Sequence, residues 1–415
     1  MAFYTEKVVT EIYNSVFDQS KYRSEFRLTP DKLFLSNMRI LNLGLKSVET
    51  SEKRYNLVNG VGAVIKNIYL YDGSVILDKV INFADYSAFQ AYNHTNQHNS
   101  DIAKLLSRNG LGFVYEKQPN EANEVSEQLT IKEAFPNCAH SPKLEQENTA
   151  MGYLNLRDVF PLLKGAGGMM YLHSGLFKNL KVVLEYGVSG SVVGEGLSEV
   201  TGTTVPILVA DCLEDAAAAE KWLSEFKQQN WISVENESVT VPASAVAGTQ
   251  DIKFRLTGSL NKFVNSVLIQ KKGSTAVSAL YGAHGSETMI DETFQIACNG
   301  ENILPNSGIT KSMERLAMLH DSFSVCNAHT SATELPMYNS AAYIDQASDR
   351  VGRLDYFGCV INQKVNSLDL SYSRLISLET GVPARYKQAL TLNVFYGVLK
   401  AIVKGSKGDY QVVYL

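Results

Sequence analysis

Alternation of apolar and polar residues is the most frequent pattern along this chain. A period of two is typical of a strand with one buried and one solvated face. It predicts strands at 33–45, 64–71, 75–80, 180–186, 251–256, 368–372, 392–396 and 410–414. Asp72-Gly73, between the second and third of these segments, favours a hairpin turn. The pattern therefore predicts antiparallel pairing of neighbouring strands.

Helical patterns are fewer and stand between the strands. Apolar residues at about every fourth position from Val8 to Phe17 predict an amphipathic N-terminal helix. The segment 211–226, with four alanines in a row and acidic residues near its start, is the clearest helix. Shorter helices are expected at 100–106, at 312–320 and at 156–163, where Pro161 would interrupt the helix. Many strands without a β–α–β rhythm favour antiparallel sandwiches over Rossmann or barrel folds.

The middle of the chain contains the predicted division between two domains. Residues 187–204 are rich in Gly, Ser, Val and Thr and divide the chain nearly in half. Phe26-Arg27-Leu28-Thr29 opens the first set of strands, and Phe254-Arg255-Leu256-Thr257 opens the second. We therefore expect an N-terminal amphipathic arm at 1–25, a first sandwich at 26–195 and a second at 196–415.

Charge and hydropathy exclude several classes of protein. The 415 residues include 38 basic and 43 acidic side chains, giving a formal charge of -5. A strong positive field that would attract nucleic acid is therefore absent, and no sequence-specific nucleic-acid partner is expected. The uncharged apolar runs are shorter than the roughly 18–20 residues that span a bilayer. The five widely spaced cysteines form no CxxC pair, which argues for a reducing compartment and against a disulfide framework.

Candidate catalytic and metal-binding residues are scattered. The segment Gly165-Ala166-Gly167-Gly168 has the glycine content of a phosphate loop but lacks the Lys-Ser/Thr that follows in one. His94 and His98 stand four residues apart, yet their Asn-rich surroundings favour a solvated loop over a metal site. Cys326 and His329 lack neighbouring partners for a nucleophile or a metal.

Cys138 and His140 are similarly isolated. A pair of glycosidase carboxylates forms only in space, so the sequence does not exclude one. We nevertheless expect no catalytic residue, no cofactor, no metal site and no enzymatic activity. A carbohydrate-binding sandwich stays an alternative, although sugar platforms usually use tryptophan and this chain has two. Trp222 and Trp231 both flank the predicted helix at 211–226, where packing against that helix is the simpler role.

Three segments taken together resemble one family, the double jelly-roll major capsid proteins of tailless icosahedral DNA viruses. They are LNLRDVFPLLKGAGGMMYLHSGLFKNLKVVLEY at 154–186, FGCVINQKVNSLDLSYSRL at 357–375, and LNVFYGVLKAIVKGSKGDYQVVYL at the end. The first is similar to the segment that closes the first jelly roll. In the second, Asn366-Ser367 and Ser373-Arg374 stand where the family has such pairs around a strand. Phe160-Pro161-Leu162 replaces the Trp-containing motif of the large-virus members, which favours the smaller relatives, such as those of virophages.

This resemblance implies a fold, an assembly and partners. The fold would be all-β, with two consecutive eight-stranded antiparallel jelly rolls and short helices in the loops. Three copies would form a pseudo-hexameric capsomer in the virion shell, assembled inside the host cell. Further partners would be minor capsid or vertex proteins, and an internal membrane reached through the N-terminal arm. A minor capsid or vertex protein of the same virion is the alternative within this class.

Overall fold

The computed structural model describes most of two β-sandwiches. The described residues are 7–18, 22–41, 45–47, 65–83, 113–119, 125–134, 149–150, 154–163, 172–187, 197–200, 206–273, 292–304, 356–376, 389–405 and 409–415, with Tyr86, Gly308, Met318 and Ser322. Among them, no helix is long and apolar enough to cross a membrane.

Strands make up most of the described chain, and two α-helices and two 3-10 turns lie between them. The strands of the first half are β1 (Val8–Asn14), β2 (Val16–Asp18), β3 (Arg23–Arg27), β4 (Leu33–Leu41), β5 (Leu45–Ser47), β6 (Ile65–Asp72), β7 (Val75–Ile81), β8 (Phe113–Pro119), β9 (Val125–Ala134), β10 (Thr149–Ala150), β11 (Leu154–Asn155), β12 (Leu172–His173), β13 (Leu180–Tyr186), β14 (Leu197–Val200) and β15 (Ile207–Leu213). Those of the second half are β16 (Gln228–Val241), β17 (Gly248–Arg255), β18 (Lys262–Gly273), β19 (Glu292–Cys298), β20 (Glu301–Asn302), β21 (Tyr356–Val365), β22 (Leu368–Ile376), β23 (Leu390–Lys404) and β24 (Tyr410–Tyr414). The helices are α3 (Leu156–Val159) and α5 (Ala216–Glu225), and the 3-10 turns are η4 (Pro161–Leu163) and η5 (Ser174–Leu176).

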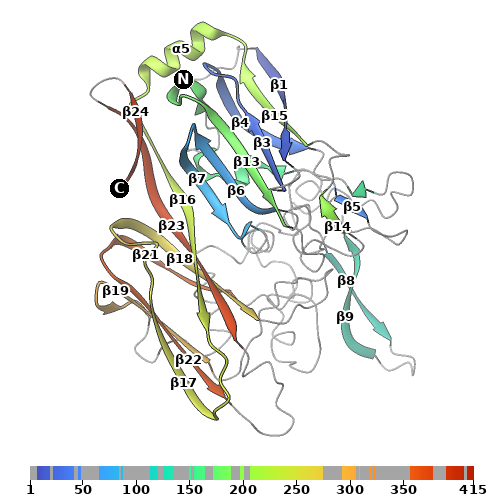
Figure 1. The fold of residues 1–415 in the computed structure, drawn as a ribbon, viewed down its shortest axis with the longest axis vertical. Coiled ribbons are helices and arrows are strands. Elements are labelled where there is room, and N and C mark those ends of the chain that lie inside the picture. The colour runs from blue at the N-terminus through green and yellow to red at the C-terminus, as the bar shows by residue number, and fades with distance from the viewer. Residues whose placement is uncertain are drawn as a thin grey trace.

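Both halves fold with the same strand order. In the first sandwich, one sheet runs β1-β15-β4-β11 and the other runs β2-β3-β13-β6-β7. In the second sandwich, the sheets run β16-β23-β18-β21 and β17-β22-β19-β20. In the first half β1 pairs with β15 and β3 with β13, and in the second half β16 pairs with β23 and β17 with β22. Pairing of early strands with late ones across the two sheets is the strand order of a jelly roll. The all-β double jelly-roll prediction is confirmed, and Figure 1 shows the first sandwich above the second.

Most of the predicted strands and the short broken helix are present. Asp72 ends β6, Gly73 adopts a left-handed φ of 59°, and β7 returns beside β6 as predicted. α3 ends before Pro161, which is the first residue of η4, because proline lacks the amide hydrogen that would continue the helix. The helix predicted at 211–226 is shorter, since 211–213 belong to β15 and Asp215 caps α5 through its side chain.

The predicted N-terminal helix is wrong, because residues 8–18 form two strands. Val8 to Asn14 pair residue by residue with β15, from Val8 beside Leu213 to Asn14 beside Ile207. Exposure alternates along β1, as expected for a strand with one inward face. Its β-branched residues suit a sheet, and the edge of β15 offers hydrogen-bonding partners that an isolated helix would lack. Residues 8–18 are thus part of the sandwich, which removes the basis for a helical arm that touches a membrane.

The position of β15 disagrees with a domain boundary between residues 195 and 196. β15 follows that division in sequence, yet it lies between β1 and β4 in the first sandwich. The pairing therefore favours a division within 214–227, around α5 and ahead of β16.

The repeated Phe-Arg-Leu-Thr segment has the same structural setting in both halves. Residues 26–29 run from the end of β3 into a turn in which Asp31 has a φ of 56°. Residues 254–257 run from the end of β17 into a turn in which Asn261 has a φ of 61°. Asp and Asn tolerate this left-handed conformation better than most residues. Each turn leads directly into the next strand, β4 or β18, so the sequence echo corresponds to equivalent loops.

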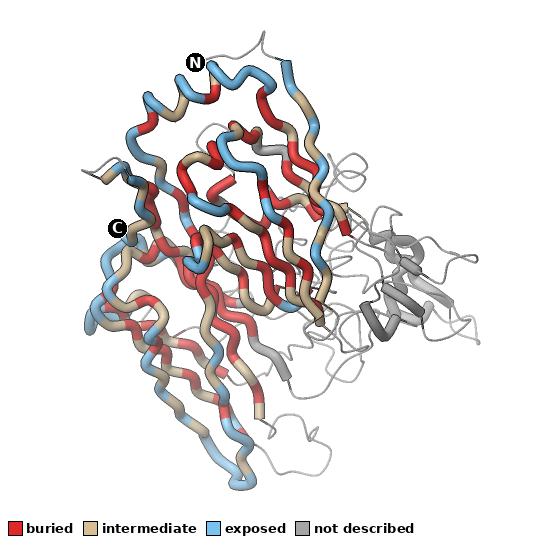
Figure 2. Tube along the Cα trace, turned by 45° about the horizontal axis from the view of Figure 1, so that its top comes forward, coloured by how far each residue is buried: buried red, intermediate tan, exposed pale blue. Residues whose placement is uncertain are grey.

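Buried apolar side chains fill the space between the sheets, and Figure 2 shows the buried positions in red along the strands of both sandwiches. The second sandwich has its own core, which includes Phe294, Phe357 and Tyr372. The core of the first sandwich includes Phe26, Phe34 and Phe160, but it also takes in residues from the second half of the chain. The two sandwiches are therefore packed against each other through apolar contacts.

Candidate functional site at the junction of the two sandwiches

The junction forms where β7 of the first sandwich lies against β16 of the second. Val234, Leu268 and Phe395 extend from the second sandwich into the core cluster of the first. The ring of Tyr86 lies 5.4 Å from the ring of Phe395. β16 and β23 are long enough to run beyond their own sandwich and reach the first, as Figure 1 shows.

A buried carboxylate stands at the centre of this contact. Asp78 on β7 is fully buried. Two side chains of β16 donate hydrogen bonds to it, the Trp231 indole Nε1 over 3.2 Å and the Ser233 hydroxyl over 2.5 Å. Its own strand supplies a third, from the backbone amide of Lys79. Because a buried carboxylate without such donors would be costly, these bonds fix β7 to β16 in one register.

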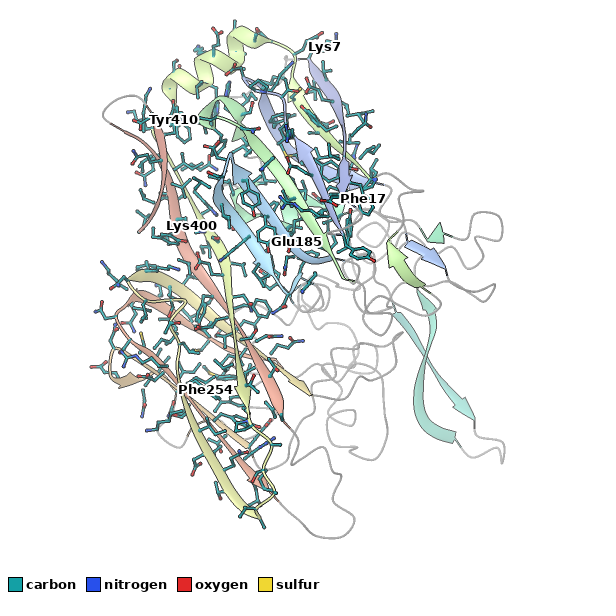
Figure 3. All side chains as sticks on the ribbon, in the orientation of Figure 1. Lys7, Phe17, Glu185, Phe254, Lys400 and Tyr410 are labelled. Carbon is teal, nitrogen blue, oxygen red and sulfur yellow. The ribbon has the colours of Figure 1, made fainter. Side chains whose placement is uncertain are left out.

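Lys400 lies near Asp78 and also belongs to a second cluster, formed with Glu235 and Lys262. Lys400, on β23, is buried; its ammonium contacts Glu235 at 3.4 Å and donates to the backbone oxygen of Leu77 at 3.3 Å. Lys262 approaches the same glutamate at 2.5 Å, and the hydroxyl of Tyr414 donates to it at 2.6 Å. Figure 3 labels Lys400 on β23, next to the first sandwich. Lys400 thus connects β7 of the first sandwich to the Glu235–Lys262 ion pair of the second.

The electrostatics of the two carboxylates differ. Burial raises the pKa of Asp78 from its ordinary 3.8 to about 6, and the nearby Lys400 only partly offsets this. Burial would also raise the pKa of Glu235, but the bonds from Lys262 and Tyr414 outweigh it and hold that pKa below its ordinary value. Glu235 is therefore charged at neutral pH, whereas Asp78 titrates within the physiological range.

The raised pKa of Asp78 predicts that this one residue favours the folded state most in mild acid. Since folded Asp78 binds its proton more tightly than in the unfolded chain, its effect is most favourable below about pH 4 and is lost as pH rises through about 6. Two pKa units correspond to roughly 3 kcal/mol. We expect Asp78→Asn to remove this pH dependence. The unfolding free energy of the variant minus that of the wild type should therefore rise by up to about 3 kcal/mol between pH 4 and pH 7.5. Urea titrations of both proteins across this range measure the difference, and parallel pH profiles would contradict the assignment.

A second buried polar cluster lies inside the second sandwich. Arg374 on β22 is fully buried and donates to the Gln250 side chain at 2.7 Å and to the Pro242 carbonyl at 2.9 Å. Beside it, the Tyr372 hydroxyl donates to Glu292 at 2.9 Å. Burial lowers the pKa of Arg374. Arg374, from the Ser-Arg pair singled out in the sequence, thus fixes the β16–β17 turn to β22, which is a structural role.

The other residues singled out from the sequence are spread apart. His94, His98, Cys138, His140, Cys326, His329 and the glycine-rich 165–168 lie outside the described residues. Within the part of the chain that the structure describes, no group of three or more His, Cys, Asp or Glu side chains could hold a metal ion. Asn366 and Ser367 form a turn in which their backbone amides donate to the side chain of Asn299. This turn joins β21 to β22.

The two tryptophans have different roles. Trp222 lies on α5, where its ring stacks on His173 at 6.1 Å and contacts Phe226, so packing around the helix is confirmed for this residue. Trp231 lies instead on β16, only 5% exposed, with its indole bonded to Asp78. A tryptophan so enclosed offers no platform for a sugar.

The junction residues were missed from the sequence. Asp78 and Lys400 each interrupt an apolar run, VILDKVI and GVLKAIVK, and a single charged residue in a strand ordinarily indicates its solvated face. The available signal was that apolar residues enclose Asp78-Lys79 in the first run and Lys400 in the second. A fully buried strand has this pattern, so each charge required a partner from another strand.

Comparisons with known proteins find similar structures but no similar sequences. A scan against protein-family models and a search of curated proteins find no match. Among solved structures, the chain is similar to the Sputnik virophage structure, with a TM-score of 0.57 and 8% identity over 98% of this chain and 88% of the other. It is also similar to the Faustovirus major capsid protein, with a TM-score of 0.55 and 8% identity over 97% and 91% of the two chains. The mavirus major capsid protein gives a TM-score of 0.51 and 10% identity over 99% and 90%. The strand order and these similarities together show that the chain has the double jelly-roll fold of viral major capsid proteins.

Proposed function

We propose that this chain is the major capsid protein of an icosahedral virus, with a structural and not an enzymatic role. The observation that carries the proposal is the presence of two jelly rolls of the same strand order in one chain, joined by a buried junction. The similarity to major capsid proteins over nearly the whole length supports it. The virion shell would be its location.

Three copies would build one capsomer. Two sandwiches per chain give six sandwiches in a trimer, which fills a pseudo-hexagonal site in a shell. The Asp78 and Glu235 clusters would serve this role by holding the two sandwiches at one fixed angle, since buried charges tolerate few alternative arrangements. Minor capsid or vertex proteins are further proposed partners.

A trimer is the first expected result. Size-exclusion chromatography with light scattering should give a mass of three times 45.8 kDa, about 137 kDa, that persists on dilution. Electron microscopy of the expressed protein should then show hexagonal particles or arrays. A monomer whose melting temperature rises with added sugars would instead favour a carbohydrate-binding sandwich and would contradict the capsid proposal.

A further inference from the structure

The junction brings an amine and a carboxyl group from different sandwiches together in the interior of the protein. Lys400 on β23 is 3% exposed, and its ammonium donates to the backbone oxygen of Leu77 on β7 at 3.3 Å. The next residue of β7 is Asp78, which is fully buried and whose carboxyl group feels the charge of Lys400. Figure 3 labels Lys400 at this place. A covalent bond between these two side chains would join the first sandwich to the second.

The surroundings of Asp78 favour attack by an amine on its carboxyl carbon. The Ser233 hydroxyl donates to Oδ1 and the Trp231 indole donates to Oδ2, so both oxygens have donors for negative charge that develops on them. Burial raises the pKa of Asp78 to about 6, so a fraction of the molecules carries the uncharged carboxylic acid at neutral pH. An uncharged acid is a much better electrophile than a carboxylate.

Glu235 is placed to take a proton from the amine. Its carboxylate lies 3.4 Å from the Lys400 ammonium and is itself buried. Burial would raise the pKa of Glu235, but the bonds from Lys262 and Tyr414 hold it below its ordinary value, so Glu235 is a charged but weak base. Because the acid, the amine and the base are all buried, little water is present to solvate them or to reverse the reaction.

We propose that Lys400 and Asp78 form an isopeptide bond that joins the two sandwiches covalently. Glu235 takes a proton from the Lys400 ammonium, and the amine nitrogen then attacks Cγ of the protonated Asp78 carboxyl group. Glu235 returns that proton to a carboxyl oxygen, which leaves as water when the C–O bond breaks, and finally takes the surplus proton from the nitrogen. One amide and one water are formed, and no oxidant, reductant or cofactor is consumed.

The structure shows the chain before this reaction, since both oxygens of Asp78 are in place as hydrogen-bond acceptors. The Lys400 ammonium must first leave the Leu77 oxygen and turn towards Asp78. Because this rearrangement precedes attack and Glu235 is a weak base, we expect the bond to form over days and not during folding. The freshly purified chain is thus unlinked, and the pH and stability predictions for these residues apply to it. The inference concerns one chain and does not depend on the proposed capsid role.

Mass spectrometry of the full chain tests the bond. The purified protein is kept for several days at room temperature and neutral pH, and we expect its intact mass to fall by the mass of one water molecule. Trypsin should then yield a branched peptide in which residues 67–79 are joined to residues 388–404, with no cleavage after Lys400.

Lys7 and Glu214 provide an internal control, because their charged atoms lie 2.8 Å apart but their side chains are 74% and 49% exposed. No branched peptide is expected from this pair, since water solvates both groups. An intact mass that stays constant would overturn the inference. So would a loss of water that maps to any pair other than Lys400 and Asp78.

Three substitutions separate the parts of the reaction. Asp78→Ala and Lys400→Met each remove a bonded atom and should abolish the loss of water. Glu235→Gln keeps the shape of the side chain but removes the base, so the rate of linking should fall by about 100-fold or more. Circular dichroism checks that each variant is folded, and the wild-type measurement stands even where one is not. Linking at an unchanged rate in folded Glu235→Gln would refute the role of Glu235. None of these outcomes affects the capsid proposal, which the trimer measurement tests.

Discussion

Replacing Lys400 by methionine should destabilise the protein by roughly 3–5 kcal/mol, the usual cost of breaking a buried ion pair. The methionine would keep most of the volume of the side chain but remove the positive charge that lies between Glu235 and β7. Asp78 would lose its attraction to this ammonium and become still harder to ionise. The free energy of unfolding from urea titrations at pH 7.5 measures the effect.

Lys404→Met is the matched control for this prediction. Lys404 lies on the same strand but is exposed, with its ammonium 5.8 Å from the ring of Tyr410. Contacts of this kind at exposed sites contribute about 1 kcal/mol or less. Equal losses in the two variants would show that burial of Lys400 does not matter. Adding Glu235→Gln to Lys400→Met measures the coupling between the two side chains, and we expect no recovery of stability, because Glu235 also pairs with Lys262 and accepts a bond from Tyr414.

Replacing Phe395 by alanine should cost about 3–5 kcal/mol and loosen the first sandwich, although the residue belongs to the second. Phe395 is buried in the core cluster of the first sandwich and packs on Tyr86. The lost side chain leaves a cavity at the junction, since the strands on either side cannot fully collapse into it. Hydrogen exchange at the amides of β7 should therefore become faster.

Phe294→Ala separates this effect from a general loss of stability. Phe294 is equally buried, but it packs on Phe357 and Tyr372 inside the second sandwich. A similar loss of unfolding free energy is expected, with exchange in β7 much less affected. Equal acceleration of exchange in β7 by the two variants would mean that the sandwiches are coupled throughout and not specifically through Phe395.

Local sequence was sufficient for strands whose partners are near in the chain. The hairpin of β6 and β7 was predicted from two alternating segments around Asp72-Gly73, and the turn at Gly73 has the expected left-handed backbone. The N-terminal segment shows the opposite case. Its apolar residues at 8, 9, 12, 13, 16 and 17 fit a helix as well as a strand. Its partner β15 lies about 200 residues away, so pairing decided its conformation.

The sequence by itself determined that the chain is all-β and antiparallel and that a strand-opening segment occurs twice, because period-two patterning and turn residues act over a few positions. Only the tertiary structure decided that Asp78 and Lys400 are buried and that Ile12 remains exposed. All three lie on strands whose patterns look alike, and burial depends on whether the other sandwich covers them. Contacts between residues more than 150 positions apart therefore define the junction, and no short-range pattern specifies such contacts.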